Sequence, residues 1–194
     1  MRIALSGGIG CGKSAALEIF KARNFPTFSA DACTRELLAS PQTVGFVVEN
    51  FGAECVENST IRRDKLATIV FSDNNARRRL ENFLHPKIEK TWREFCSAAE
   101  GAGKIPVVEI PLLFEKNYDA EFDITICVAC SRETQLSRLE KRGVGAADAE
   151  RRMAAQLPLE NKIARANILL SNDGSLEFLE AQIDLLCPKL SHQN

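Results

Sequence analysis

Gly7-Gly8-Ile9-Gly10-Cys11-Gly12-Lys13-Ser14 lies close to the start of the chain and matches the pattern G-x-x-x-x-G-K-[ST] of a phosphate-binding loop. A short apolar run at 2–6 precedes the match and a helical pattern at about 12–23 follows it, as this motif requires. Glycines allow successive backbone N–H groups to turn inward around an anion, and the positive end of the following helix points at the same place. The residues that we expect to contact phosphate are Gly8, Ile9, Gly10, Cys11, Gly12, Lys13, Ser14 and Ala15.

Two side chains of the motif carry specific chemistry: the Lys13 amine can reach the β- and γ-phosphates, and the Ser14 hydroxyl can ligate Mg²⁺. Other glycine-rich nucleotide sites fit less well. The third glycine of G-x-G-x-x-G would fall on Lys13 or Ala15, and the guanine-reading N-K-x-D occurs only at 161–164, without its aspartate. The motif therefore indicates a P-loop protein that uses ATP and Mg²⁺, and argues against a dinucleotide-dependent oxidoreductase or a GTPase.

The composition excludes further classes of protein. The chain has 194 residues, 45% hydrophobic, with 25 basic and 26 acidic side chains and a net charge of -1. Near-neutral charge argues against a general binder of nucleic acid or of anionic membranes. No apolar run approaches the ~20 residues that span a bilayer, and the first apolar run breaks at Gly7, so we expect neither a membrane segment nor a signal peptide. Seven cysteines without framework-like spacing favour reduced thiols in a soluble cytoplasmic protein.

The apolar pattern predicts an α/β fold. Short buried strands are expected at 2–6, 26–29, 104–110, 122–128 and 167–170. Strands separated by helices form a parallel sheet with helices on both faces, the three-layer fold of P-loop kinases. We expect one domain, with an almost entirely helical acceptor-binding insert at about 31–100, punctuated at His85-Pro86 among other points, and a helical lid at about 131–166. A final helix is expected at about 175–186, ended by Pro188.

Acidic and basic side chains near the expected sheet edge are candidates for the chemistry. Asp31 follows the second strand and is either a general base for a hydroxyl acceptor or the N-cap of the next helix. Glu109 closes an apolar run and either supports Mg²⁺ through water or is a solvated strand-end carboxylate. The arginines of the lid either stabilise migrating phosphate charge when the lid closes or are solvated; they are Arg132, Arg138, Arg142, Arg151 and Arg152.

Taken together, these residues resemble the dephospho-coenzyme A kinase family over nearly the whole chain. The resemblance rests on the loop at 4–14, Ser29-Ala30-Asp31 leading to Arg35, Leu84-His85-Pro86, the segment Glu109-Ile110-Pro111-Leu112-Leu113-Phe114-Glu115, the lid start at 133–138, then Arg152, Gln156, Lys162 and Asn172-Asp173-Gly174. The Gly-Gly-Ile-Gly form of the loop and the P-L-L-F-E segment are its most specific parts. Members of this family phosphorylate the ribose 3′-hydroxyl of dephospho-CoA with ATP.

The resemblance implies a role for each matching residue. Asp31 is expected to be the general base, with Lys13 and Arg138 as further catalytic residues. The acceptor side comprises Asp31, Arg35, His85, Pro86 and Leu113, the lid contacts phosphate through Arg138 and Arg142, and Asn172 and Gly174 lie near adenine. The chain departs from the family at Ser29 and Asn167, where aspartate is common, and at Ala15, where threonine is usual.

Two alternatives remain open at this stage. One is a P-loop kinase for another small-molecule or nucleotide acceptor, and the other is a regulator that binds ATP without transferring phosphate. The expected partner is a small-molecule acceptor, with no nucleic acid and no membrane, and the expected state is a monomer or a weak homo-oligomer.

Overall fold

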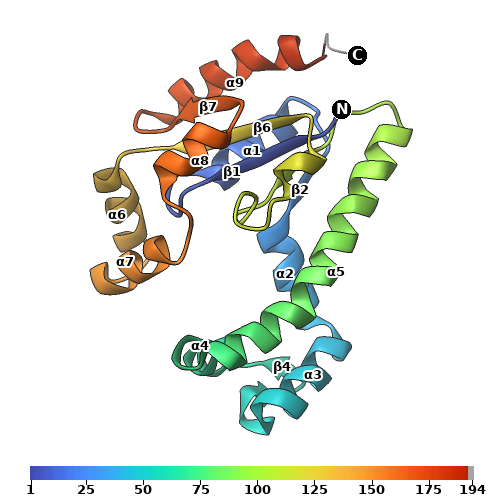
Figure 1. Cartoon of the computed structure of the whole chain (residues 1–194), viewed down its shortest axis with the longest axis vertical. Coiled ribbons are helices and arrows are strands. Elements are labelled where there is room, and N and C mark those ends of the chain that lie inside the picture. Colours follow the sequence, from blue (N-terminus) through green and yellow to red (C-terminus); the bar gives the residue numbers. More distant parts are fainter. Residues whose placement is uncertain (192–194) are drawn as a thin grey trace. The chain divides into compact units, whose positions relative to one another are not determined.

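The computed structural model describes residues 1–191, apart from the side chain of Ser191. Residues 1–29 and 95–191 form one compact unit, which we call the sheet unit, and Ala30–Glu94 form another, the helical unit. Figure 1 shows the elements of both. No helix within these described residues is long and apolar enough to cross a membrane.

The sheet unit is built on five parallel strands. They are β1 (Ile3–Gly7), β2 (Thr27–Ser29), β5 (Val107–Glu109), β6 (Ile124–Ala129) and β7 (Ile168–Ser171), in the order β2-β5-β1-β6-β7. Leu5 of β1 lies opposite Glu109 of β5 and Ile126 of β6. This parallel sheet confirms the predicted fold class, and its three central strands, β5, β1 and β6, are almost entirely buried, as expected of strands covered on both faces.

Helices cover the two faces of this sheet. Ile3 and Leu5 belong to a core cluster shared with α1 (Lys13–Ala22) and α9 (Leu176–Ser191). Side chains alternate along a strand, so Ala4 faces the opposite layer, where α8 (Leu159–Arg165) packs on β1 and β6. The layers place the amino end of α1 directly after β1, at the carboxyl edge of the sheet, where open α/β folds bind ligands.

The predicted lid segment consists of α6 (Arg132–Glu140), α7 (Ala146–Ala154) and α8. The Ser131 hydroxyl caps α6 by accepting a hydrogen bond from the Thr134 backbone N–H. A short 3-10 helix, η2 (Tyr118–Glu121), follows the P-L-L-F-E segment and leads into β6.

The helical unit comprises α2 (Ala30–Ala39), α3 (Pro41–Phe51), the 3-10 helix η1 (Ala53–Cys55), α4 (Arg63–Ser72) and the first part of α5 (Asn74–Gly101). Its small core includes Val47, Phe51 and Leu66. The segment is almost entirely helical, and it also contains an antiparallel hairpin that the sequence did not predict, formed by β3 (Val56–Glu57) and β4 (Thr60–Ile61) around the expected break at Asn58-Ser59. Asn58 and Ser59 make its turn with positive φ angles of 49° and 58°, as the favoured two-residue hairpin turns require.

The two expected helix stops at proline are wrong. Helix α5 continues through Pro86, and α9 continues through Pro188 to Ser191. A proline removes one helical hydrogen bond and crowds the preceding turn. Buried side chains on both sides of each proline outweigh that local cost; on α5 these are Leu84, Trp92 and Cys96, and beyond Pro188 it is Leu190.

Candidate active site

The phosphate loop connects β1 to α1, and the side chain of Lys13 folds back over the backbone of the loop. Gly12 caps α1 with φ 92°, a left-handed conformation that favours glycine. The Lys13 side chain is buried, and its Nζ donates hydrogen bonds to the carbonyl oxygens of Gly7 (3.2 Å) and Gly8 (3.0 Å). The structure therefore places a cation over a glycine loop at the start of a helix, an arrangement suited to anions.

A buried carboxylate lies beside the loop. Glu109, at the end of β5, is 1% exposed. Its Oε1 accepts a hydrogen bond from Ser14 Oγ (3.3 Å), and its Oε2 accepts one from Ser29 Oγ (2.8 Å). Ser29, the position at which the family commonly has aspartate, thus supplies a hydroxyl that orients Glu109. Carboxylate and hydroxyl oxygens gathered at this edge are the donors that Mg²⁺ prefers.

The outer side of the loop is held by side chains from distant segments. Gln135 Nε2 donates to Ile9 O (2.6 Å), Arg138 Nη1 to Gly10 O (3.4 Å), and Asn172 Nδ2 to Cys11 O (2.8 Å). Arg138 Nη2 also donates to Asn172 O (2.8 Å). The structure thus brings the predicted Arg138 and Asn172 against the loop, and adds Gln135, which sequence reasoning did not single out.

Cys11 lies within the loop and contacts a second thiol. The Cys130 thiol donates a hydrogen bond to Cys11 Sγ at 3.6 Å. This hydrogen bond lowers the pKa of Cys11 to about 7, against the opposing effect of burial, and the same contact raises the pKa of Cys130. All seven cysteines lie in the described part of the chain, and there they form no disulfide.

The lid arginines differ in their surroundings. Arg132 pairs with Glu150 at 2.5 Å, and both Arg151 and Arg152 pair with Asp148. Arg142 is exposed in the turn that follows α6. Arg138 therefore differs from Arg132, Arg151 and Arg152 in that its guanidinium contacts the phosphate loop.

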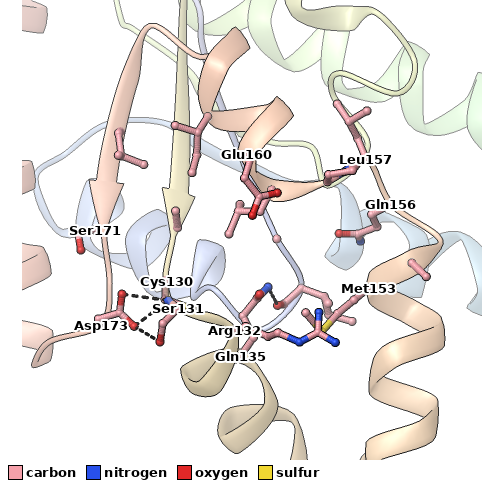
Figure 2. A pocket seen from close by; sticks show the side chains of 18 of the residues that line it. Cys130, Ser131, Arg132, Gln135, Met153, Gln156, Leu157, Glu160, Ser171 and Asp173 are labelled. Carbon is pink, nitrogen blue, oxygen red and sulfur yellow. Dashed lines mark hydrogen bonds between the residues drawn. The ribbon is translucent and has the colours of Figure 1, made fainter.

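A hollow of about 680 Å³ adjoins the start of the loop. It is bounded by Gly8 and Ile9, by the turn after β6, and by lid residues between 150 and 163, and Figure 2 shows it from close by. At one side, Asp173 accepts hydrogen bonds from the Ser131 backbone N–H (2.8 Å) and hydroxyl (2.7 Å). These bonds, with a third from the Thr134 hydroxyl, lower the pKa of Asp173. They fix the end of β7 to the start of α6.

A buried ion pair connects the P-L-L-F-E segment to the end of the lid. Lys162 of α8 is 0% exposed, and its Nζ lies 2.9 Å from Glu115 Oε1 and donates to Pro111 O at 3.0 Å. The backbone N–H of Leu157 also donates to Glu115 Oε1 at 2.9 Å. One carboxylate therefore holds the loop after α7 and helix α8 to the segment that follows β5.

We expect Lys162→Met to destabilise the protein by about 3–5 kcal/mol, because Glu115 would keep a largely buried carboxylate without its cation. Denaturant unfolding measures this. Exposed Lys116 provides the control: Lys116→Ala should stay within about 0.5 kcal/mol of wild type. The double variant Lys162→Met/Glu115→Gln should recover part of the loss, and an unchanged stability of Lys162→Met would contradict this account of the pair.

The remaining predicted site residues are divided between the two units. In the helical unit, Asp31 is exposed in the first turn of α2, Arg35 is exposed on the same helix, His85 is half-buried and Pro86 exposed on α5. In the sheet unit, Gly174 is exposed after β7, whereas Leu113 is fully buried. The Leu113 side chain is therefore not presented to solvent. Asn167, the third departure, accepts hydrogen bonds from the Thr125 backbone and hydroxyl.

A five-stranded parallel sheet of this order, with a lysine-bearing glycine loop between β1 and α1, defines a protein of the P-loop kinase class. The family model for dephospho-CoA kinase (CoaE) matches residues 1–177. The chain belongs to the dephospho-CoA kinase family, and it is an ATP-using kinase of coenzyme A biosynthesis.

Individual relatives agree with this membership. A dephospho-CoA kinase of Syntrophotalea carbinolica is 37% identical over 193 residues, covering 97% of this chain and 91% of its own. Among solved structures, dephospho-CoA kinase from Campylobacter jejuni is 25% identical with a TM-score of 0.76, covering 100% of this chain and 98% of its own. The Thermus thermophilus protein TT1252 is 31% identical with a TM-score of 0.82, covering 98% and 97%.

Proposed function

We propose that this kinase transfers the γ-phosphoryl group of ATP to the ribose 3′-hydroxyl of dephospho-CoA, giving coenzyme A and ADP. The observation that carries the proposal is the convergence of Lys13, Ser14 and Glu109 at the carboxyl edge of the sheet, with the glycine loop between them. To catalyse phosphoryl transfer, a protein mainly has to position the reacting groups and stabilise the negative charge of the phosphates. A buried cation, a glycine loop at the start of a helix and a carboxylate–hydroxyl cluster can do both.

The residues beside the loop fit Mg²⁺. Ser14 is exposed and offers a hydroxyl oxygen, while Glu109 lies 3.3 Å behind it and orients it. In the proposed site Ser14 is the ligand and Glu109 supports the ion through water. When bound, Mg²⁺ neutralises charge on the β- and γ-phosphate oxygens.

Lys13 and the lid share the charge of the transferred group in this proposal. Lys13 exchanges its two loop carbonyl partners for phosphate oxygens when ATP binds. Arg138 already lies at the loop, and exposed Arg142 approaches phosphate when the lid closes. Asn172 and Gly174 border the nucleotide after β7. Charge-assisted contacts of this kind are stronger in a site from which the lid excludes water.

Asp31 is the proposed general base. It follows Ser29 by two residues, which span at most about 7 Å of extended chain, and Ser29 is hydrogen-bonded to Glu109. Asp31 is exposed, so its carboxylate is available to accept a hydroxyl proton. Arg35 lies one helical turn further along α2, on the same face. We assign the acceptor side to Asp31, Arg35, His85 and Pro86, with Leu113 supporting the P-L-L-F-E segment.

The direct test incubates purified protein with Mg²⁺, ATP and dephospho-CoA, measures ADP release, and identifies the product by mass spectrometry. A product one phosphate heavier at the 3′-position supports the proposal. Transfer to a different acceptor in a panel of nucleosides and small alcohols would indicate another kinase, and ATP binding without any transfer would indicate a regulator. We further propose a monomer or weak homo-oligomer in the cytoplasm, where seven cysteines without disulfides stay reduced.

The Glu109→Gln variant tests the assignment at the Mg²⁺ site. Glutamine keeps the shape and still accepts a hydrogen bond through one oxygen, but it removes the negative charge behind Ser14. We expect the Mg²⁺ concentration for half-maximal rate to rise about tenfold, on the scale seen when a group that orients a metal ligand is lost. Glu140→Gln, which removes an exposed carboxylate at the end of α6 in the same unit, is the control. Equal Mg²⁺ dependence in Glu109→Gln and wild type would refute the assignment.

A further inference from the structure

The carbonyl oxygens of the phosphate loop are held from outside by two buried carboxamides. Gln135 is 4% exposed and Asn172 is 5% exposed. Their amide nitrogens donate to Ile9 O at 2.6 Å and to Cys11 O at 2.8 Å. Each peptide unit carries its N–H opposite its C=O, so anchoring these carbonyls outward turns the following N–H groups inward, where an anion binds.

Two loop glycines leave room for these amides. A Cβ on Gly8 would lie 2.6 Å from Gln135 Nε2, and a Cβ on Gly12 would collide with Asn172 Nδ2. Any side chain at either position would push the carboxamide away from its carbonyl. The glycines of the motif therefore serve contacts on the outside of the loop, in addition to the turn that they permit on the inside.

The main chain of each of these two carboxamide residues is itself held by hydrogen bonds. Asn172 N–H donates to Ala129 O at 2.8 Å, and Asn172 O accepts from Arg138 Nη2 at 2.8 Å. Gln135 N–H donates to Ser131 O at 3.0 Å within α6. The loop is thus braced by the end of β7 and by the first turns of α6, two segments that are far from it in sequence.

We propose that Gln135 and Asn172 are positioning residues for ATP, which hold the phosphate loop in its anion-binding form by binding Ile9 O and Cys11 O. The proposal rests on the proposed function in that the loop holds the triphosphate of ATP. It assigns the amide donor of Asn172 to the loop backbone, because Nδ2 is engaged by Cys11 O, while the residue still borders the nucleotide in the proposed function. A loop that is already in its bound shape loses less entropy on binding, so the bracing lowers KM and, since the same N–H groups stabilise the transferred charge, raises kcat.

The test compares two ligands that share only the phosphate chain. Gln135→Glu and Asn172→Asp keep the shape of each side chain but replace the amide donor with an oxygen that repels the carbonyl. We expect each variant to raise the Kd of Mg·ATP and the Kd of Mg·tripolyphosphate by the same factor, about tenfold. The neutral variants Gln135→Met and Asn172→Leu should change both Kd values in the same direction, which separates loss of the bond from charge repulsion.

Asn50→Asp is the control. Its Nδ2 donates to Phe46 O at 2.9 Å, so the variant loses the same kind of bond between an amide and a backbone carbonyl, but within α3 of the helical unit. Thermal unfolding of every variant shows whether each is folded, and Asn50→Asp should leave both Kd values unchanged. A higher Kd for Mg·ATP with an unchanged Kd for tripolyphosphate would overturn the proposal for that residue, as would unchanged Kd values in a folded variant, or Kd changes that follow Tm in the control as well.

The outcome for wild type separates this proposal from the proposed function. Wild-type protein that binds tripolyphosphate but does not phosphorylate dephospho-CoA would refute the acceptor and leave the bracing testable on the same variants. Wild-type protein that binds neither Mg·ATP nor Mg·tripolyphosphate would refute the phosphate site and the bracing together.

Discussion

Replacing Asp31 with asparagine is expected to lower kcat by about 10²-fold or more while leaving ATP affinity nearly unchanged. Asparagine has the same size as aspartate and is equally acceptable at the start of a helix, so α2 should form normally. What the variant loses is a carboxylate that can accept the hydroxyl proton as the bond to phosphorus forms. The measurement is single-turnover transfer from ATP to dephospho-CoA, because steady-state rates can be limited by product release.

Asp64 offers a matched control for this experiment. It occupies the first turn of α4, in the same helical unit, as Asp31 does in α2. Asp64→Asn removes the same charge from a comparable helix start but leaves the proposed base in place. It should therefore change the single-turnover rate little. Near-normal transfer by Asp31→Asn would reject its role as base, and a comparable loss in Asp64→Asn would show that helix stability, not proton transfer, limits the rate.

The fold could be predicted where its signals are local. The three central strands, β5, β1 and β6, are short runs of buried residues, and the loop motif requires a strand before it and a helix after it. The hairpin at Val56–Glu57 and Thr60–Ile61 escaped prediction because strands of two residues have no periodicity to detect. The stops expected at Pro86 and Pro188 failed for a different reason: packing of buried side chains beyond each proline outweighs a local preference.

Candidate site residues could be predicted where a sequence motif itself specifies the residue and its chemistry. Lys13 and Ser14 follow from the loop pattern, and Glu109 from its place at a strand end. Gln135 did not, because it reaches Ile9 across 126 positions of sequence and its surroundings in the chain are those of an ordinary helix start. Only its unusual burial, as a polar residue in the first turns of a charged helix, distinguishes it.

Ser29 shows a second limit of sequence reasoning. Compared with the family, Ser29 stands where an aspartate carboxylate is common. In the structure its hydroxyl donates to Glu109 at 2.8 Å and completes the cluster with Ser14. A pattern identifies which residue stands at a position, but the partner of that residue depends on how β2 and β5 pair, and Ser29 lies directly opposite Glu109 in that pairing.

Replacing Lys13 with alanine is expected to impair both ATP binding and transfer. Loss of a charged hydrogen bond should weaken ATP affinity by about 10- to 100-fold. Loss of a fixed positive charge on the migrating phosphoryl group should lower kcat by a further factor of about 10² or more. Equilibrium binding of Mg·ATP and single-turnover transfer measure the two effects separately.

Lys21→Ala and Lys13→Met complete this experiment. Lys21 lies on the same helix and is exposed beside Glu18, so its removal should leave both quantities unchanged. Lys13 is buried and donates to Gly7 O and Gly8 O, so its alanine variant loses packing and loop contacts as well as charge. Methionine restores most of the volume without the charge. If Lys13→Met recovers ATP affinity, the lysine acts by filling the loop; if it stays as impaired as alanine, the charge itself binds phosphate, which is the result we expect. Unchanged ATP affinity in both variants would refute the assignment of the loop as the phosphate site.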